Sequence, residues 1–312
     1  MATMGIRTRL ASGATPVGQG TTAGDACRGW ECEMTEYADD PDQPTPAEPG
    51  LHALAHAARV ARTVRTFVVD WLPVFIVLFA YDAIHNRLGA FLPRAHTWPQ
   101  IHADEALFGA PVPTVRLQQA LYSTSHPHWW DFAALLVYTS HFVVPELIAL
   151  VLWVRSRGLY LRFMTSFVAM TTLGYVTYVL FPAVPPWLAS QHGDLAPTHR
   201  LVRELWDHLG YPAMAGLFSG SNLYANDVAA IPSLHAAYPV MIALFFSPRS
   251  GRAVRVGLWL YAVAMALALV YSAEHFVVDI ALGWLYAIGT ALIVQRFWPR
   301  GPDPVRGAAG RG

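Results

Sequence analysis

The sequence contains no lysine: all 21 of its basic residues are arginine, and 21 acidic residues balance them to a formal net charge of zero. Charged residues make up 13% of the 312 residues, about half the share typical of soluble domains. Without an excess of positive charge, the chain does not fit a nucleic-acid-binding protein. Cysteine is equally scarce. No Cys or His partners flank Cys27 and Cys32, which argues against a metal or redox site there.

Apolar residues are abundant, at 54% of the chain, and their distribution predicts three regions. Residues 1–50 hold few large apolar side chains and many Gly, Pro, Asp and Glu, so we expect a disordered cytoplasmic leader. It has no apolar core typical of a cleaved signal peptide. Residues 51–298 are predicted to form the membrane catalytic domain, and residues 299–312 a disordered cytoplasmic tail.

Six segments are apolar enough to cross a membrane core of about 30 Å, which takes roughly 20 helical residues. They are approximately 66–86, 132–154, 163–181, 232–247, 256–273 and 276–296. The predicted fold is therefore all-α, a polytopic membrane protein built as a six-helix bundle. The first segment is the least uniformly apolar, because it contains Asp70 and Asp82, which could mark its two ends at the membrane interface. In the long first connection, we expect Trp98, Trp129 and Trp130 at the membrane interface.

Arginine positions predict the orientation of the bundle, because cytoplasmic loops are enriched in them. The short segments before span one, between spans two and three, between four and five, and after six carry most of the loop arginines. All four of these segments fall on the same side of the membrane. We therefore expect a multi-pass protein of the cell membrane with both termini in the cytoplasm.

The stretch "YSAEHFVVDIALGW", residues 271–284, falls at the outer turn between the last two spans. His275 and Asp279 are four residues apart, so on a helix they would share a face. An aspartate one turn below a histidine can accept its Nδ1 proton and leave Nε2 as a nucleophile. The pair predicts an activated imidazole.

The stretch "AAIPSLHAAYP", residues 229–239, supplies a second imidazole, His235, at the outer end of span four. Pro232 suits the first turn of a helix, and the free N–H groups around Ser233 and Leu234 would form an anion cradle. Two histidines, an orienting acid and a helix N-terminus provide what phosphoryl transfer needs.

The motifs "PSLH" and "EHFVVD" resemble two signatures, PSGH and SRxxxxxHxxxD, of the type 2 phosphatidic acid phosphatase superfamily. The resemblance covers residues 66–296 and includes the six spans, as in the lipid phosphate phosphatases. "YVLFPAVPPW" and the leucine of "PSLH" are similar to the inositolphosphotransferase-like branch that contains the inositol phosphorylceramide synthases. The resemblance implies His275 as nucleophile, Asp279 as its orienting acid and His235 as general acid. It implies no metal and no other cofactor.

The same resemblance implies a phosphate contact for Ser233, although Ser233 could simply be a helix N-cap. We assign four further residues to the substrate site: Pro232, Tyr271, Pro186 and Trp187. The prolines of "FPAVPPW" could instead merely end the third span.

Two family signatures are missing, and both supply cations to the phosphate. KxxxxxxRP is absent, and Ala268 and Leu269 stand where the family has Ser-Arg. Arg116, Arg200 and Arg203 are the candidates for a replacement. The loss is compatible with the synthase-like branch and weakens the inference that the product is free phosphate.

Other polar residues receive a structural interpretation. His141 and Glu146 lie within span two, where a hydrogen bond across the bundle is at least as plausible as a role in function. Glu274 is expected to be a solvated acid at the interface. Histidines of the outer loops show no spacing that indicates zinc.

The prediction is a metal-independent membrane enzyme, a phosphatase or phosphotransferase acting on a lipid-linked phosphate or phosphodiester at the extracytoplasmic face. Water as acceptor makes it a phosphatase; a lipid or sugar hydroxyl makes it a transferase, for instance of a phosphoinositol head group. A non-enzymatic alternative also stays open: a haem-binding protein, a transporter or an inactive relative.

Overall fold

The computed structural model describes residues 49–217 and 227–298. The chain divides into two units, Met1–Val60 and Ala61–Gly312. In the first unit only the start of a helix is described. Most of the predicted leader, with Cys27 and Cys32, and the tail from residue 299 lie outside the described residues.

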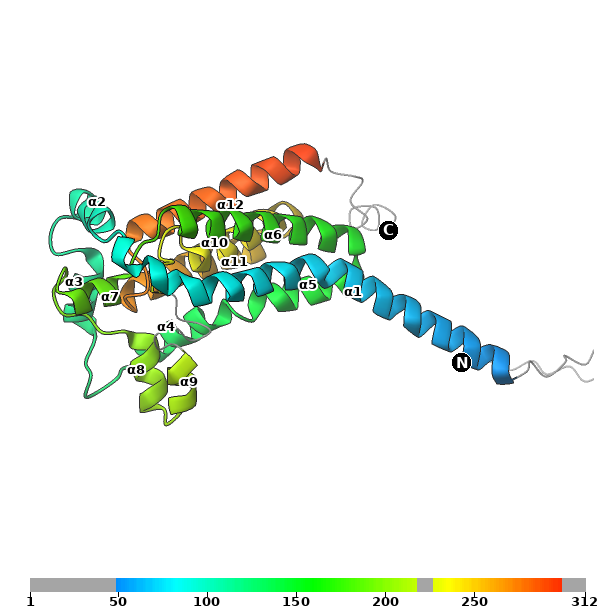
Figure 1. Cartoon of the computed structure of the whole chain (residues 1–312), viewed down its shortest axis with the longest axis horizontal. Helices are drawn as coiled ribbons and strands as arrows, with labels where there is room; N and C mark the ends of the chain where they lie inside the picture. The colour runs from blue at the N-terminus through cyan, green and yellow to red at the C-terminus, as the bar shows by residue number, and fades with distance from the viewer. Residues whose placement is uncertain (1–48, 218–226, 299–312) are drawn as a thin grey trace, which may run out of the picture. The chain divides into compact units, whose positions relative to one another are not determined.

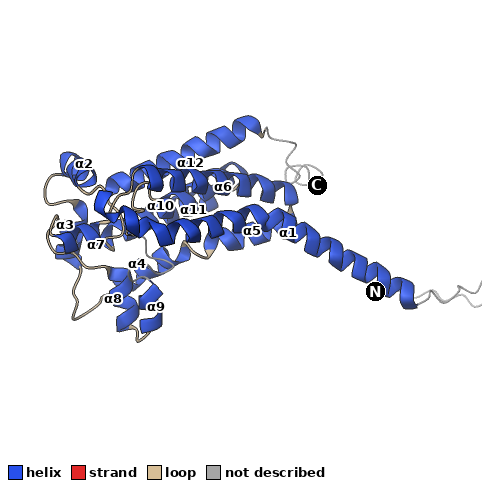
Figure 2. Ribbon diagram, viewed as in Figure 1, coloured by secondary structure: helices blue, strands red, loops and turns tan. Residues whose placement is uncertain are grey.

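Within the described ranges the regular elements are all helices (Figures 1 and 2), which confirms the all-α class. The elements are α1 (Pro49–Leu88), η1 (Gly89–Arg94), α2 (Trp98–Phe108), α3 (Pro113–Leu121), α4 (Trp129–Ser140), α5 (Val144–Arg155), α6 (Arg157–Leu180), α7 (Pro186–His192), α8 (Leu201–His208), α9 (Pro212–Leu217), α10 (Leu234–Phe246), η2 (Ser247–Arg249), α11 (Arg252–Tyr271) and α12 (Val277–Phe297).

Each of the six predicted spans coincides with helix, but not all of them meet the length of a membrane span. In the described part of the chain, α6, α11 and α12 are long and apolar enough to cross a membrane. The pair α4 and α5 passes the same test together, with a bend of 44° between them. The structure thus supports three or four spans, and the count of six stays a prediction. One reason is α10, whose 13 residues are fewer than the roughly 20 that a span takes.

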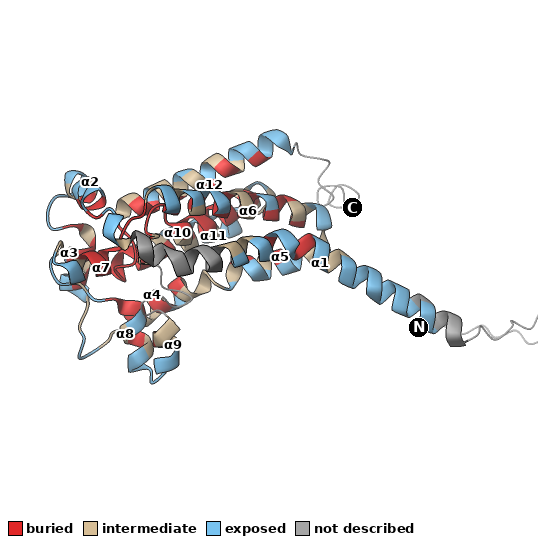
Figure 3. Cartoon of the chain, in the orientation of Figure 1, coloured by how far each residue is buried: buried red, intermediate tan, exposed pale blue. Residues whose placement is uncertain are grey.

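Exposed apolar side chains on these helices indicate a lipid-facing surface. Leu260 on α11 and Leu292 on α12 are each 63% exposed, and Leu180 at the end of α6 is 77% exposed. Faces of this kind are typical of contact with lipid rather than with water. In contrast, buried residues gather around α10, where it packs against its neighbours (Figure 3).

Helix α10 packs against α6, α11 and α12. The contacts at the start and at the end of α10 identify the two ends of the bundle. At its start, Pro232 O accepts a hydrogen bond from the Tyr178 hydroxyl near the end of α6. At its other end, Phe245 packs against Phe163 near the start of α6. Helix α6 therefore runs antiparallel to α10. Arginines of the α5–α6 turn, of η2 and of the end of α12 belong to the second end, which we call the arginine-rich end.

Asp70 ties α1 to the arginine-rich end. Its carboxylate accepts two hydrogen bonds from Arg157, at 2.8 Å from Nε and 2.6 Å from Nη2. This bidentate geometry is the strongest form of such a pair, and the buried Asp70 carboxylate is also in contact with Trp153. The side chain of Asp82 is outside the described part.

Three loops meet at the opposite end of the bundle. The backbone of Ala183, after α6, forms isolated bridges with His96, before α2, and with Ala229, before α10. Ala183 N donates to Val228 O at 2.9 Å, and Ala230 N donates to Ala183 O at 3.1 Å. These bonds hold the loop before α10, which carries the "PSLH" motif, in a fixed position.

Candidate active site

Helix α12 begins two residues after the predicted nucleophile, His275. Phe276 is its N-cap residue, and Asp279 Oδ2 accepts a hydrogen bond of 2.9 Å from the Phe276 N–H. His275 therefore precedes the helix, and the prediction that His275 and Asp279 share a helical face is wrong. The two side chains still approach each other across the first turn, with 3.6 Å between His275 Nδ1 and Asp279 Oδ2. At this distance the two atoms are in close contact but beyond hydrogen-bond range.

A second buried carboxylate holds the start of α12. Asp104, on α2, accepts hydrogen bonds from the N–H groups of Val277 and Val278, at 2.9 and 3.0 Å. These are two of the donors that a helix start leaves without an intrahelical acceptor. Burial raises the pKa of Asp104, and the two N–H groups partly offset this effect. Asp104 was not predicted from the sequence, because its contact with α12 joins segments 173 residues apart.

The "PSLH" motif forms the start of α10, with Ser233 as N-cap. The Ser233 Oγ accepts a hydrogen bond of 3.3 Å from Ala236 N. Pro232 lies before this N-cap residue, so its predicted place in the first helical turn is wrong. The predicted anion cradle also changes, because Ser233 N donates to Asp279 O at 2.9 Å. Of the first N–H groups, those of Leu234 and His235 are the ones left for an anion.

The starts of α10 and α12 are in backbone contact at Gly283. A Cβ atom at this position would lie 2.2 Å from Ser233 O, a distance that real Cβ atoms do not show. Gly283 thus permits the close approach of the two helices. Together with the bond from Ser233 N to Asp279 O, this contact fixes the two motifs relative to each other.

The two predicted catalytic imidazoles face each other as expected. His275 Nε2 lies 3.4 Å from His235 Nδ1, and the ring centroids are 5.5 Å apart with 53° between the planes. His275 is buried, and His235 is partly buried. Phosphoryl transfer between two imidazoles requires a gap between the rings wide enough for a phosphoryl group. The structure closes that gap, because 3.4 Å leaves no room for a phosphorus atom and its oxygens.

The bend between α4 and α5 brings three more rings to His235. Tyr138 stacks on it with centroids 5.1 Å apart, Phe142 meets it edge-on at 5.7 Å, and His141 lies closest at 4.0 Å. His141 was left outside the predicted core site, and Tyr138 was not considered. Pro145 in the sequence predicts this bend, and the structure confirms it. Which side chain lies next to His141 depends on how the bent helix packs, which the sequence does not show.

Three histidines therefore gather at this end of the bundle: His141, His235 and His275. Even so, among residues 49–217 and 227–298, no group of three or more His, Cys, Asp or Glu side chains has an arrangement that could hold a metal ion.

Arg200 is the one candidate cation that the structure brings beside this site. Its Nε donates to Glu274 Oε1 at 2.8 Å and its Nη2 to Glu274 Oε2 at 3.2 Å. Both side chains are 8% exposed, so the expectation that Glu274 is solvated is wrong. Burial by itself lowers the pKa of Arg200, but nearby groups, Glu274 foremost among them, together outweigh this effect, and the net shift of the pKa is upward.

Trp187 completes the surroundings of Arg200. The guanidinium carbon lies 4.3 Å from the centroid of the indole ring, a cation–π geometry. Trp187 N also donates to Ala273 O at 3.1 Å, which places the start of α7 beside the turn before His275. Pro186 is the first residue of α7 and is buried. Both predicted substrate-site residues therefore lie beside the histidine motif.

Gln118, on α3, anchors the loop that carries Arg200. It donates to His199 O and accepts from His199 N, at 2.8 and 2.7 Å, and it also donates to Tyr271 O at 2.8 Å. The hydroxyl of Tyr271 in turn donates to the buried Asp131 carboxylate. Tyr271 thus belongs to a network that holds α3, α4 and α11 together, and its predicted contact with substrate stays a prediction.

Of the other two candidate cations, one forms hydrogen bonds with backbone oxygens and the other is exposed on the surface. Arg116 donates to the backbone oxygens of Phe108, Gly109 and Pro111, where it closes the turn between α2 and α3. Arg203 is exposed on α8.

With this geometry in view, the sequence was compared with known proteins. The sequence model of the PAP2 superfamily matches residues 101–293. The chain belongs to this superfamily. The matched range includes both histidine motifs and the loop of Arg200, so the resemblance inferred from "PSLH" and "EHFVVD" is confirmed.

Two relatives in the PAP2 superfamily are named as synthases of the kind found in the inositolphosphotransferase-like branch. A phosphoinositol dihydroceramide synthase of Bacteroides thetaiotaomicron is 32% identical over 214 residues, 65% of this chain and 67% of the relative. The inositol phosphorylceramide synthase catalytic subunit aur1 of Schizosaccharomyces pombe is 27% identical over 164 residues, 50% of this chain and 38% of the relative. No solved structure matches the chain.

Proposed function

We propose that this protein is a membrane phosphotransferase that moves a phosphorus-bearing head group from a lipid donor to an alcohol through a phosphohistidine. The observation that carries the proposal is the pair of imidazoles, with His275 Nε2 and His235 Nδ1 only 3.4 Å apart. Superfamily membership and the two synthases support a lipid substrate.

In the first half-reaction, His275 Nε2 attacks phosphorus, and the bond between phosphorus and the leaving alcohol breaks. His235 Nδ1 gives its proton to the leaving oxygen. The Asp279 carboxylate, 3.6 Å from His275 Nδ1, stabilises the positive charge that develops on the ring. The products are the free alcohol and a phosphohistidine.

In the second half-reaction, the acceptor hydroxyl attacks phosphorus and gives its proton to His235. The nitrogen–phosphorus bond breaks, and both histidines return to their starting states. The rings must first separate to admit the phosphoryl group. Its oxygens would then meet the N–H groups at the start of α10 and the positive charge of Arg200.

A lipid hydroxyl is the acceptor that we favour, because both relatives are named as synthases of inositol phospholipids. The proposed donor is accordingly a phosphoinositol lipid. Transfer to water by the same residues would make the protein a phosphatase, and this is the second candidate. We place the reaction at the extracytoplasmic leaflet, since the histidines lie at the end of the bundle opposite the arginine-rich end.

The test is a transfer assay with the purified full chain. Phosphatidylinositol labelled in its head group is supplied with ceramide as the hydroxyl lipid, and the products are separated. Label in a second lipid supports transfer; label only in water-soluble products supports hydrolysis.

The variant His275→Ala should abolish both outcomes, a loss of at least about a hundredfold, because no other group replaces the nucleophile. His126→Ala is the matched control, since His126 is exposed in the loop before α4 and should leave the rate unchanged. Normal turnover in His275→Ala would remove the assignment of the nucleophile.

A further inference from the structure

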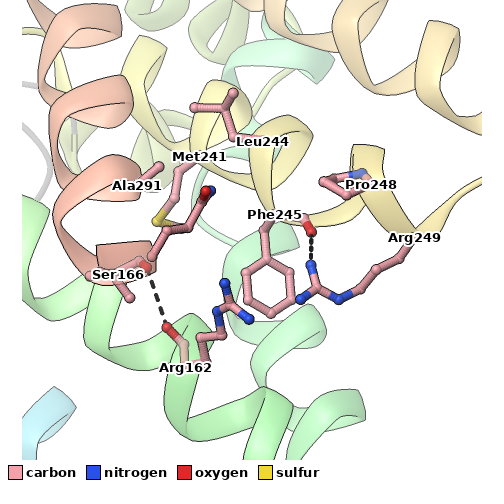
Figure 4. A pocket seen from close by; sticks show the side chains of 10 residues that line it. Arg162, Ser166, Met241, Leu244, Phe245, Pro248, Arg249 and Ala291 are labelled. Atoms are coloured by element: carbon pink, nitrogen blue, oxygen red, sulfur yellow. Dashed lines mark hydrogen bonds between the residues drawn. The ribbon is translucent and has the colours of Figure 1, made fainter. Parts of the chain in front are cut away.

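Figure 4 shows a cavity at the arginine-rich end, between α6, α10 and α12. Its volume of about 20 Å³ is room for about one water molecule, so it offers no space for a substrate or a lipid head group. Polar groups that the proposed reaction leaves unused lie instead at the opposite end, among the three histidines. His141 is the one of the three that this reaction does not use.

His141 faces two rings of α10. It follows α4 directly, in the turn that separates α4 from α5, and its N–H donates to Tyr138 O at 3.1 Å. Its ring centroid is 4.0 Å from that of His235 and 5.0 Å from that of Tyr238. His235 and Tyr238 are three residues apart on α10 and so are neighbours on one helical face. The bend between α4 and α5 thus places His141 against the helix that carries the proposed general acid.

Tyr238 supports His141 from the side of α6. Its ring stacks on Phe167, with centroids 4.7 Å apart and 18° between the planes, and its hydroxyl forms a hydrogen bond of 2.7 Å with the Thr171 hydroxyl. Both partners are buried residues of α6. Because α6 and α10 together fix Tyr238, His141 packs against a fixed neighbour while it contacts His235.

Imidazole nitrogens in this group are buried without a hydrogen-bond partner. They are His141 Nδ1, His235 Nε2 and His275 Nδ1. Buried polar atoms of folded proteins are nearly always paired, so an unpaired atom at a proposed active site calls for an explanation. For His275 the Asp279 carboxylate provides one, since it lies 3.6 Å from Nδ1. His141 Nδ1 and His235 Nε2 remain, and they belong to two rings that are in contact.

The proposed reaction requires an acceptor at His235 Nε2. As general acid, His235 begins as an imidazolium, which carries an N–H on both ring nitrogens. Nδ1 gives its proton to the leaving oxygen, whereas the N–H at Nε2 is kept throughout. A buried charged ring with an unpaired N–H is costly, so an acceptor for this N–H favours the protonated form. Among the rings in contact with His235, that of His141 carries such an acceptor, the unpaired Nδ1.

Given the proposed phosphotransfer, on which this inference rests, we propose that His141 is a positioning residue for His235. His141 Nδ1 accepts a hydrogen bond from the Nε2–H of His235 when the rings of His235 and His275 separate to admit the phosphoryl group. The rings of His141 and His235 are already in contact with 33° between their planes, so a change of tilt, without a shift of the backbone, pairs the two nitrogens. No proton moves between them, because His141 stays neutral with its own proton on Nε2.

Two substitutions separate this role from packing. His141→Phe keeps a ring of similar size but has no nitrogen, whereas His141→Asn loses the ring but places an amide near the position of Nδ1. The full chain is purified in each form, and Tm and head-group transfer are measured. We expect His141→Phe to keep a Tm near that of the wild type, with kcat at least about tenfold lower and KM unchanged. His141→Asn should have the lower Tm of the two variants but the higher kcat.

Ser140→Ala is the matched control, because Ser140 precedes His141 in the same turn. It removes the hydrogen bond of 2.7 Å with the Tyr261 hydroxyl, so we expect a lower Tm and an unchanged kcat. If activity follows Tm, with His141→Phe more active than His141→Asn, His141 serves packing alone and the proposal is overturned. A higher KM with an unchanged kcat in His141→Phe would overturn it as well, because the residue would then bind substrate.

The wild type and His275→Ala are assayed beside these variants. A wild type that catalyses neither transfer nor hydrolysis would refute the proposed function, and the role of His141 with it. An active wild type with an inactive His275→Ala leaves the proposed function standing. Normal turnover in His141→Phe would then refute the role of His141 alone.

Discussion

A buried ion pair lies immediately before the proposed nucleophile. Glu274 is adjacent to His275 in the chain, and Arg200 reaches it from the loop before α8. Both family signatures that usually supply cations are missing here, so Arg200 is the group best placed to neutralise phosphate oxygens. If it does, Arg200 has two separate roles, one in folding and one in the reaction.

These roles can be separated by a pair of substitutions. Arg200→Gln leaves Glu274 buried without its cation, which should lower the free energy of unfolding by about 3 kcal/mol. Adding Glu274→Gln removes the unpaired charge and should recover much of that loss. Activity should not recover in the double variant, because the cation stays absent. The measurements are thermal unfolding and head-group transfer.

Arg203→Gln provides the control, since Arg203 is exposed three residues further along the same segment. Full recovery of activity together with stability in the double variant would mean that Arg200 serves only the fold.

The sequence motifs located two imidazoles that the structure brings together, but the partners of the residues around them were not predicted, and the catalytic roles stay predictions. His275 and Asp279 are close because they are four residues apart, whereas His235 reaches His275 through the contact between α10 and α12. Glu274 was expected in solvent because nothing near it in the sequence is positive, while its partner is 74 residues away. His141 has the same explanation, since its contact with His235 depends on the packing of a bent helix against α10.

At the scale of the elements, the site depends on how closely α12 approaches the start of α10. Gly283→Ala would place a methyl group 2.2 Å from Ser233 O, and a backbone atom cannot move aside without moving its helix. We expect a destabilisation of about 1–3 kcal/mol, as for overpacked cores. Because the displaced turn carries His235, transfer activity should fall at least tenfold, measured at saturating lipid.

Gly289→Ala on the same helix is the control, because a Cβ there meets nothing within 4 Å. Equal behaviour of the two alanine variants would show that the contact at Gly283 does not position the histidines.

Helix starts are where the prediction from sequence was least accurate. The spacing of His275 and Asp279 predicted a shared helical face, but Asp279 accepts a hydrogen bond from Phe276 N, so Phe276 is the N-cap residue and His275 lies before the helix. A side chain that accepts a hydrogen bond from the N–H group three residues earlier in the chain can start a helix there and stop it from extending further toward the N-terminus. The spacing of two residues does not show whether such a cap forms. In the same way, α10 begins at Leu234 with Ser233 as its N-cap, so Pro232 lies before the helix.

At the scale of the whole molecule, the apolar runs predicted where the helices lie, but they did not predict how many of the helices are long enough to span a membrane. The run at 132–154 is two helices bent by 44°, and the run at 232–247 gives a helix of 13 residues. Hydropathy measures how apolar a segment is. A helix buried within a bundle can be as apolar as a helix that spans the membrane, so hydropathy does not distinguish the two. Helix α10 is almost entirely covered by its neighbours, so its apolar character reflects core packing as much as contact with lipid.

The orientation of the bundle is the remaining prediction, and it rests on the arginine-rich end facing the cytoplasm. In a background with Cys27→Ser and Cys32→Ser, two single cysteines report the two ends: Ser125→Cys in the exposed loop before α4, and Gly251→Cys in the turn before α11, where a side chain meets nothing within 4 Å. A membrane-impermeant thiol reagent applied to intact cells should label Ser125→Cys, and should label Gly251→Cys only after permeabilisation. The reverse pattern would place the histidine pair on the cytoplasmic side, and head groups of the outer leaflet could then not be its substrates.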